Sequence, residues 1–142
     1  MTIEREDRVR FDETDQQGVV YYGEFFTFMD EAAMTLFRAG GFDVATQREA
    51  GWTTHIVHAS MDYRAPAHYG DVLVSRASVE SMGTTSLTVD YEARTKATPE
   101  PLASGTSVYV TVDLETDDPI PLPSAFRDAM TEVSDEQSGT NS

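Results

Sequence analysis

The sequence predicts an α+β fold in which a five-stranded antiparallel sheet packs against one long helix. Two periodicities carry this prediction: residues 25–38 repeat apolar side chains at helical spacing, and residues 52–114 alternate apolar and polar side chains, as strands do. One more alternating segment precedes the helix. A helix with a wide apolar stripe needs a sheet to cover, and strands joined by short turns pair as antiparallel hairpins.

The first elements are a strand over residues 4–11 and a polar turn over residues 12–18. In the strand, Val9 and Phe11 share one face among charged neighbours. A β-prone segment at residues 19–22 then leads into the helix. The helical stripe consists of Phe25, Met29, Ala32, Ala33 and Leu36, widened by Phe26 and Phe37. Gly40 and Gly41 end the helix, because glycine adopts the left-handed conformation common at helix C-termini.

The remaining strands follow an irregular connection or short second helix at residues 42–51. The next strand places His55, Val57, Ala59, Met61 and Tyr63 on one face, and Pro66 terminates it. Three further alternating segments cover residues 73–79, 85–93 and 108–114. Ser124 is expected to begin a short helix that runs through Met130. We therefore predict one domain over residues 1–131 and a disordered acidic tail over residues 132–142.

Composition narrows the class of protein. The 142 residues suffice for a single domain with an ordinary core, and 39% of them are hydrophobic. No stretch approaches the ~20 apolar residues that span a bilayer, and the N-terminus lacks the features of a signal peptide, so a cytoplasmic protein is expected. The sequence has no cysteine, which excludes disulfides, thiolate metal sites and a cysteine nucleophile.

The charge balance is strongly acidic. Twenty-five acidic residues against ten basic ones give a net charge of −15, and Lys96 is the single lysine. Nucleic acid and anionic membrane surfaces are poor partners for such a chain, because both require clustered cations. An ordinary acidic protein with an acidic tail is one explanation. The near-absence of lysine favours another, a halophilic protein adapted to concentrated salt, where self-repulsion is screened.

The strongest candidate for chemistry is the acidic turn before the helix. Asp15 lies just upstream of a helix start, where free backbone N–H groups and the positive end of the helix dipole favour negative charge. Asp12 and Glu13 are equally close carboxylates, and composition does not choose among the three. An aspartate before a glycine is also common in turns for purely local reasons.

Other catalytic patterns are absent from the sequence. His55, His58 and His68 do not form a metal cluster, because the first two are expected on opposite faces of a strand and the third in a loop. No Gly-x-Ser-x-Gly or Gly-x-Gly-x-x-Gly occurs, so neither a nucleophile elbow nor a dinucleotide site is supported.

Residues 9–38 closely resemble the 4-hydroxybenzoyl-CoA thioesterase family of hot-dog fold proteins. The matching string is Thr14-Asp15-x-x-Gly18-Val19-Val20-Tyr21-Tyr22-x-x-Phe25, followed by the helix. Tyr63-Arg64-Ala65-Pro66-Ala67 and Gly70-Asp71-Val72-Leu73-Val74 extend the likeness, as does the proline-rich stretch before residue 128. The resemblance implies a sheet wrapped around one long helix, active sites at the interface of a homodimer or homotetramer, and acyl-CoA thioesters as substrates.

The resemblance also implies roles for residues. The family's catalytic carboxylate falls on Asp15, and its oxyanion donor falls on the backbone N–H of Tyr22. Gly18, Gly23 and Phe25 are expected to contact substrate, with Gly23 allowing close approach. No metal or redox cofactor is implied, since coenzyme A is part of the substrate. Asp15 would act as a nucleophile or as a general base on water, and the sequence leaves both roles open.

The chain departs from the family's pattern at residues 82–86, where some members carry arginines that contact the phosphates of coenzyme A. This stretch has no cation here, so Arg64, Arg94 or backbone amides are the alternatives. A non-hydrolytic thioester-binding protein remains an alternative function. A hot-dog hydratase or dehydratase ranks lower, because that chemistry generally uses a histidine beside the helix start, and none occurs before His55.

Overall fold

The computed structural model describes the backbone of residues 2–140 and the side chains of residues 2–132. Its five strands form one antiparallel sheet in the order β1-β3-β4-β5-β2. The strands are β1 (Ile3–Arg8), β2 (Trp52–Tyr63), β3 (Val72–Met82), β4 (Ser86–Thr95) and β5 (Ala103–Asp113). The predicted fold class is confirmed. Because β1 and β2 form the two edges, only one side of each is paired within the chain.

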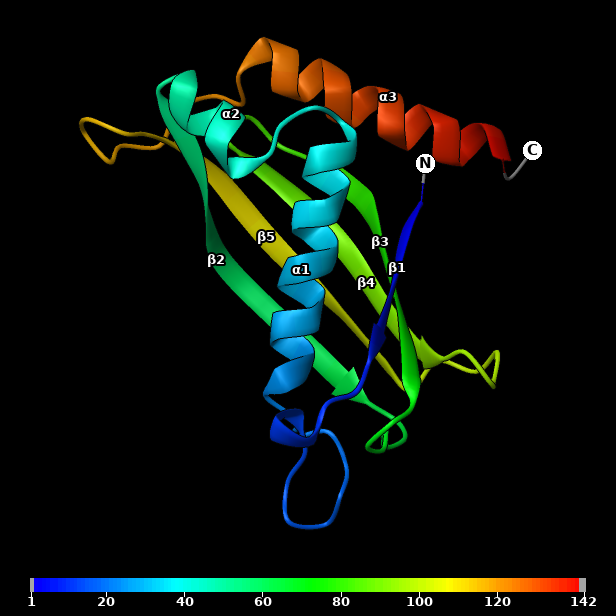
Figure 1. Ribbon diagram of the computed structural model, residues 1–142. Coiled ribbons are helices and arrows are strands. Elements are labelled where there is room, and N and C mark those ends of the chain that lie inside the picture. The colour runs from blue at the N-terminus through cyan, green and yellow to red at the C-terminus, as the bar shows by residue number, and fades with distance from the viewer. Residues whose placement is uncertain (1, 141–142) are drawn as a thin grey trace.

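Helix α1 (Glu24–Ala39) lies across one face of this sheet (Figure 1). Its apolar stripe is the one expected from the sequence, with Phe28 added and Phe26 only partly buried. The buried residues of α1 are Phe25, Phe28, Met29, Ala32, Ala33, Leu36 and Phe37. They meet the alternate buried residues of β4, which are Leu87, Val89, Tyr91 and Ala93. The main core therefore lies between α1 and the sheet.

Two further helices cover the end of the sheet near the C-terminus of α1. Helix α2 (Val44–Glu49) begins where Asp43 accepts a 2.8 Å hydrogen bond from the N–H of Thr46. Helix α3 (Ser124–Thr140) crosses that end of the sheet (Figure 1). It extends beyond Met130, where the sequence predicted its end. Residues 141–142 lie outside the described residues, and disorder of the tail stays a prediction.

The first strand is shorter than expected. It ends at Arg8, and Phe11–Glu13 forms a 3-10 turn closed by a 2.8 Å hydrogen bond from the Arg10 N–H to Glu13 Oε1. Val9 is buried, as the alternation predicts, but Phe11 is 80% exposed. The chain has left the sheet at Val9, so the two-residue period no longer governs Phe11.

A β-bulge in β2 corrects the expected assignment of its faces. His55 pairs with Val110 and His58 with Val108, and the register shifts between Ile56 and His58. Because Val108 and Val110 lie two residues apart in β5, their partners His55 and His58 share a face rather than lying on opposite ones. The extra residue at Val57 is the reason, since it reverses the alternation beyond it.

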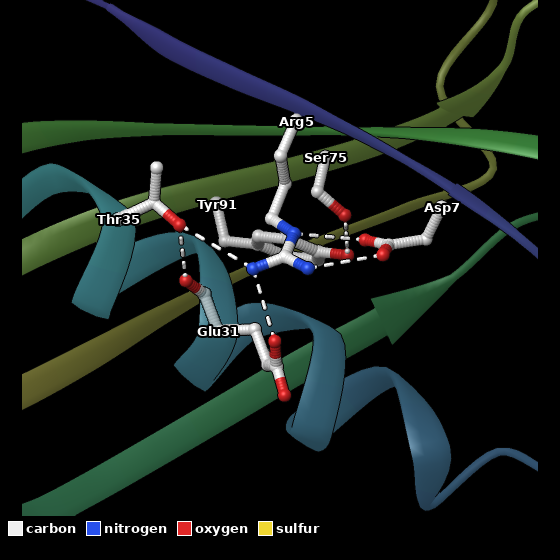
Figure 2. Close-up of polar contacts among 6 residues, drawn as sticks. All are labelled: Arg5, Asp7, Glu31, Thr35, Ser75 and Tyr91. Carbon is white, nitrogen blue, oxygen red and sulfur yellow. Dashed lines mark hydrogen bonds and ion pairs between the residues drawn. The ribbon is translucent and has the colours of Figure 1, made fainter.

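A polar cluster joins the edge strand β1 to α1 (Figure 2). The Arg5 guanidinium donates to both carboxylate oxygens of Asp7 at 2.9 and 3.0 Å, and lies 2.9 Å from Glu31 Oε2 on α1. The hydroxyls of Ser75 and Tyr91 are 2.9 Å apart beside it, and burial raises the pKa of Tyr91. These contacts of the Arg5 guanidinium with Asp7 and Glu31 thus hold β1 against α1, just before the chain enters the candidate site.

Candidate active site

The acidic turn before α1 folds as a small hairpin at one end of the molecule. Thr14 and Val20 form an antiparallel bridge, and the Asp15 N–H donates to the Val19 carbonyl at 2.8 Å. The Gly18 N–H closes the turn onto the Asp15 carbonyl at 3.0 Å. Gly18 has a φ of +79°, a conformation that glycine adopts without steric cost. This glycine is therefore required by the turn that presents Asp15.

The connection between β2 and β3 holds this hairpin in place. The Val20 N–H donates to the Ala67 carbonyl at 2.8 Å, and Val19 bridges to His68. Ala67 is fully buried. Residues 14–25 and 63–74, which are far apart along the chain, thus form one structural unit. Sequence periodicity could not reveal this link, because it joins loops distant along the chain.

The Asp15 carboxylate is exposed, and one of its two oxygens accepts a hydrogen bond. Its Oδ1 accepts a 2.8 Å hydrogen bond from the Gln17 N–H, the local turn contact considered above. Within the part of the chain that the structure describes, Oδ2 accepts no hydrogen bond. The neighbouring Glu13 is engaged in the same way, since Oε1 of its carboxylate accepts the Arg10 N–H at 2.8 Å in the 3-10 turn. The turn contact therefore orients the Asp15 carboxylate while one oxygen remains available to a reactant.

Helix α1 begins with two unused donors. The N–H groups of Glu24, Phe25 and Phe26 donate to the carbonyls of Tyr21, Tyr22 and Gly23 at 2.9, 3.3 and 3.2 Å. The N–H groups of Tyr22 and Gly23 themselves donate to no atom of the described residues. They lie at the positive end of the helix dipole, where an anion is stabilised. The predicted Tyr22 donor is thus free, and that of Gly23 is free beside it.

Aromatic side chains surround this helix start. The Tyr63 hydroxyl donates to the Tyr22 carbonyl at 2.8 Å, and the rings of Tyr21 and Tyr22 have their centroids 4.6 Å apart. Phe25 packs edge-on against Tyr63 at 5.8 Å and is only 3% exposed. Phe25 therefore belongs to the core of a single chain, and its contact with substrate stays a prediction. The sequence predicts Tyr63 only as a strand residue within a family-like segment, and its contact with the helix start is a finding of the structure.

Gly23 is placed where a side chain would be crowded. A Cβ atom added there would lie 2.8 Å from Cε2 of the Tyr21 ring. The backbone itself is ordinary, with φ −66° and ψ −24°. Glycine at this position therefore leaves room for the Tyr21 ring, and its conformational freedom is not used.

A cavity beside β1 reaches the acidic turn at Glu13. It has a volume of about 660 Å³ and lies between β1 and α1, with Arg5, Arg8 and Glu31 in its wall, but it includes neither Asp15 nor Tyr22. Asp15 and Tyr22 are both exposed in the single chain. Both arginines considered for the phosphates of coenzyme A already have partners. Arg64 donates to the Ser104 hydroxyl at 2.8 Å, and Arg94 lies 4.0 Å from the Glu4 carboxylate.

Among residues 2–140, no group of three or more His, Cys, Asp or Glu side chains is arranged to hold a metal ion. No helix within the same range is long and apolar enough to cross a membrane.

Known proteins resemble this chain in both sequence and structure. The sequence model of the thioesterase superfamily matches residues 17–101. The protein YneP of Bacillus subtilis, provisionally named an acyl-CoA thioesterase, is 29% identical over 87% of this chain and 89% of its own length. A 1,4-dihydroxy-2-naphthoyl-CoA hydrolase of Synechococcus elongatus is 28% identical over 84% of this chain and 88% of its own. The crystal structure of Slr0204, a 1,4-dihydroxy-2-naphthoyl-CoA thioesterase from Synechocystis, superimposes with a TM-score of 0.85 at 27% identity, covering 94% of this chain and 98% of that one.

Proposed function

Because the chain belongs to the thioesterase superfamily, we propose that it hydrolyses acyl-CoA thioesters at the start of α1. The observation that carries the proposal is the pair of free N–H groups at Tyr22 and Gly23, next to the turn that presents Asp15. The names of its relatives, which include acyl-CoA and 1,4-dihydroxy-2-naphthoyl-CoA thioester hydrolases, support the same substrate class.

The Tyr22 N–H serves as the oxyanion donor. Attack on a thioester carbonyl produces a tetrahedral intermediate whose oxygen carries a full negative charge. A preorganised donor at that oxygen typically lowers the barrier by about 3–4 kcal/mol. The helix dipole adds favourable potential at the same point, because the positive end of α1 faces outward there.

Asp15 supplies the carboxylate by one of two routes. As general base it takes a proton from water, the resulting hydroxide attacks the carbonyl carbon, and collapse of the intermediate expels the coenzyme A thiolate, which is then protonated. As nucleophile it attacks the carbonyl carbon itself, expelling the thiolate and forming a mixed anhydride that water then hydrolyses. Both routes consume one water and yield the carboxylic acid and free coenzyme A. The free Oδ2 suits either route.

A panel of acyl-CoA thioesters with detection of the released thiol, in concentrated KCl, tests the proposal. Wild type should release thiol, and Asp15→Asn should lower kcat by roughly 10²–10⁴-fold, the usual contribution of an acid–base group. Asp12→Asn is the matched control, because Asp12 is an exposed carboxylate in the same loop. Absence of cleavage by wild type, or an Asp15→Asn variant as fast as wild type, rules the mechanism out. Binding without release of thiol identifies the non-hydrolytic alternative.

The acyl group is proposed to be aromatic. Tyr22 and Tyr63 are 62% and 44% exposed, and their rings meet edge to face at 6.2 Å beside the free N–H groups. Flat aromatic acyl groups pack favourably against such rings. Two of the relatives named above act on a naphthoyl thioester. A higher kcat/KM for hydroxyaroyl-CoA than for straight-chain acyl-CoA of similar size is expected. The reverse order contradicts this assignment.

The active form is proposed to be a homodimer or homotetramer. β2 is an edge strand, and Ile56 and Val57 on it are 49% and 59% exposed. An unpaired edge with exposed apolar side chains invites pairing with a second copy. A second subunit would also close the open site. Light scattering in concentrated salt should give a mass at least twice that of the 15.7 kDa chain, whereas a monomer contradicts the shared-site arrangement. A cytoplasmic location and the absence of nucleic-acid and membrane partners stay predictions from the sequence.

A further inference from the structure

The Tyr63 hydroxyl lies behind the peptide bond that joins Tyr22 to Gly23. It donates to the Tyr22 carbonyl at 2.8 Å, and the same oxygen accepts a longer bond, 3.3 Å, from the Phe25 N–H. The peptide unit is planar and trans, so the Gly23 N–H points to the opposite side from this carbonyl. Whatever fixes the carbonyl oxygen therefore also fixes the direction of the Gly23 N–H.

Tyr63 is well placed to fix that carbonyl. Its backbone is paired with Ala103 at the end of the long β2–β5 ladder. Its ring packs edge-on against Tyr22 and against the buried Phe25. Partial burial, with a smaller contribution from Tyr22, raises the pKa of Tyr63, so the phenol stays protonated and remains a donor at neutral and mildly alkaline pH. The hydroxyl thus comes from a residue held by both strand pairing and ring contacts.

We propose that the Gly23 N–H is a second oxyanion donor beside that of Tyr22, and that Tyr63 is the positioning residue that aims it. This inference rests on the thioesterase function proposed above. The Tyr63 bond draws electron density from the Tyr22 carbonyl and so strengthens the N–H of the same peptide as a donor. Two adjacent donors hold an oxyanion more firmly in one place than one donor does.

Tyr63→Phe is the informative variant, because it removes the hydroxyl and keeps the ring that packs on Tyr22 and Phe25. Loss of a whole oxyanion donor costs about 10²–10³ in kcat, and a misaimed one costs less, so a loss of about tenfold is expected. KM should change by less than about twofold, since the thioester ground state depends little on this donor. Tyr69→Phe is the matched control, because the Tyr69 ring is also exposed and its hydroxyl has no hydrogen-bond partner among the described residues.

A second readout follows the peptide itself without turnover. In protein labelled with 15N-glycine, the Gly23 amide nitrogen should shift upfield in Tyr63→Phe, because its peptide carbonyl loses a hydrogen bond. The resonance of Gly105, which lies in β5 and pairs with Met61 and Tyr91, should stay in place. A merely structural role for Tyr63 would lower the Tm and leave kcat per folded molecule unchanged.

The outcomes separate this inference from the proposed function. A tenfold lower kcat with a shifted Gly23 resonance supports both. Wild-type turnover together with a Tyr63→Phe kcat within twofold of wild type, or an unmoved Gly23 resonance, overturns only the positioning role. A wild type that cleaves no thioester overturns the function, and the second donor with it.

Discussion

At Gly23 the absence of a side chain leaves room for a neighbouring ring, although the backbone has an ordinary helical conformation. Its φ and ψ lie in the helical region, so alanine is allowed conformationally. The obstacle is the Tyr21 ring, 2.8 Å from the position of an added Cβ. Tyr21 is 47% exposed and can swing aside. A side chain added at Gly23 is therefore expected to disturb the candidate site and not the stability of the fold.

We expect Gly23→Ala to lower kcat/KM by roughly 10–10²-fold, because both the added methyl and the displaced ring intrude on the free N–H groups. The free energy of unfolding, measured by urea denaturation, should change by less than about 0.5 kcal/mol. Gly83→Ala is the matched control, since a Cβ there would lie equally close, 2.8 Å, to Ser86 Oγ but in a hairpin far from Asp15 along the chain. Full activity in Gly23→Ala would show that substrate does not approach this residue.

Residue type alone does not identify the catalytic carboxylate. Asp12, Glu13 and Asp15 were equivalent by composition, and the resemblance singled out Asp15. Hydrogen bonding does not separate Glu13 from Asp15, because each carboxylate accepts one backbone N–H at 2.8 Å through a single oxygen. The choice of Asp15 stays a prediction from the resemblance. The Tyr63 hydroxyl had no sequence signal of its own. Its role depends on where β2 ends relative to α1, which is a property of the folded chain.

Among the elements, the edge strand β1 is held to α1 by Arg5. Its guanidinium binds Asp7 on the strand and Glu31 on the helix (Figure 2). We expect Arg5→Met to lower the free energy of unfolding by about 1–2 kcal/mol, because the guanidinium is partly buried and its loss leaves Asp7 and Glu31 unpaired. Arg94→Met, which breaks only the 4.0 Å pair with Glu4, should cost less than about 0.5 kcal/mol. Equal effects of the two variants in urea denaturation would contradict a special role for Arg5.

Helix α3 divides into an anchored part and a remainder. Phe126 and Met130 are fully buried, and Phe126 contacts the rings of Phe37, Phe42 and Trp52 with centroids 5.5, 5.4 and 5.1 Å apart. A chain truncated after residue 131 keeps all of these contacts. Its free energy of unfolding should stay within about 1 kcal/mol of wild type, whereas Phe126→Ala should lose about 3–5 kcal/mol. A truncation that unfolds the protein would contradict the predicted domain limit.

The elements were predictable where one period runs uninterrupted. The stripe of α1 and the alternation of β4 each follow from side-chain spacing, and both are confirmed. The errors fall where a single residue breaks the period. The bulge at Val57 moves His55 and His58 onto one face, and the 3-10 turn takes Phe11 out of β1. Neither change leaves a sequence signal, because both satisfy backbone hydrogen bonds specific to the folded chain.

For the whole molecule, the net charge of −15 sets the electrostatics of encounter with substrate. A thioester of coenzyme A carries several negative charges on its phosphates and is repelled by such a protein. Charges on separate molecules interact over about 10 Å in 0.1 M salt but only about 3 Å in 1 M salt. Concentrated salt should therefore remove most of the barrier to association.

We expect kcat/KM for an acyl-CoA to rise as KCl increases from about 0.1 to 2 M, with kcat changing less because screening acts on encounter. The control is the N-acetylcysteamine thioester of the same acid, which has the same reacting bond and no phosphate. Its kcat/KM should follow only the fraction of folded protein, read in parallel from the unfolding curve at each salt concentration. An acyl-CoA rate that stays flat or falls with the fold intact contradicts the screening argument. An equal rise for both thioesters would assign the salt effect to folding or subunit assembly instead.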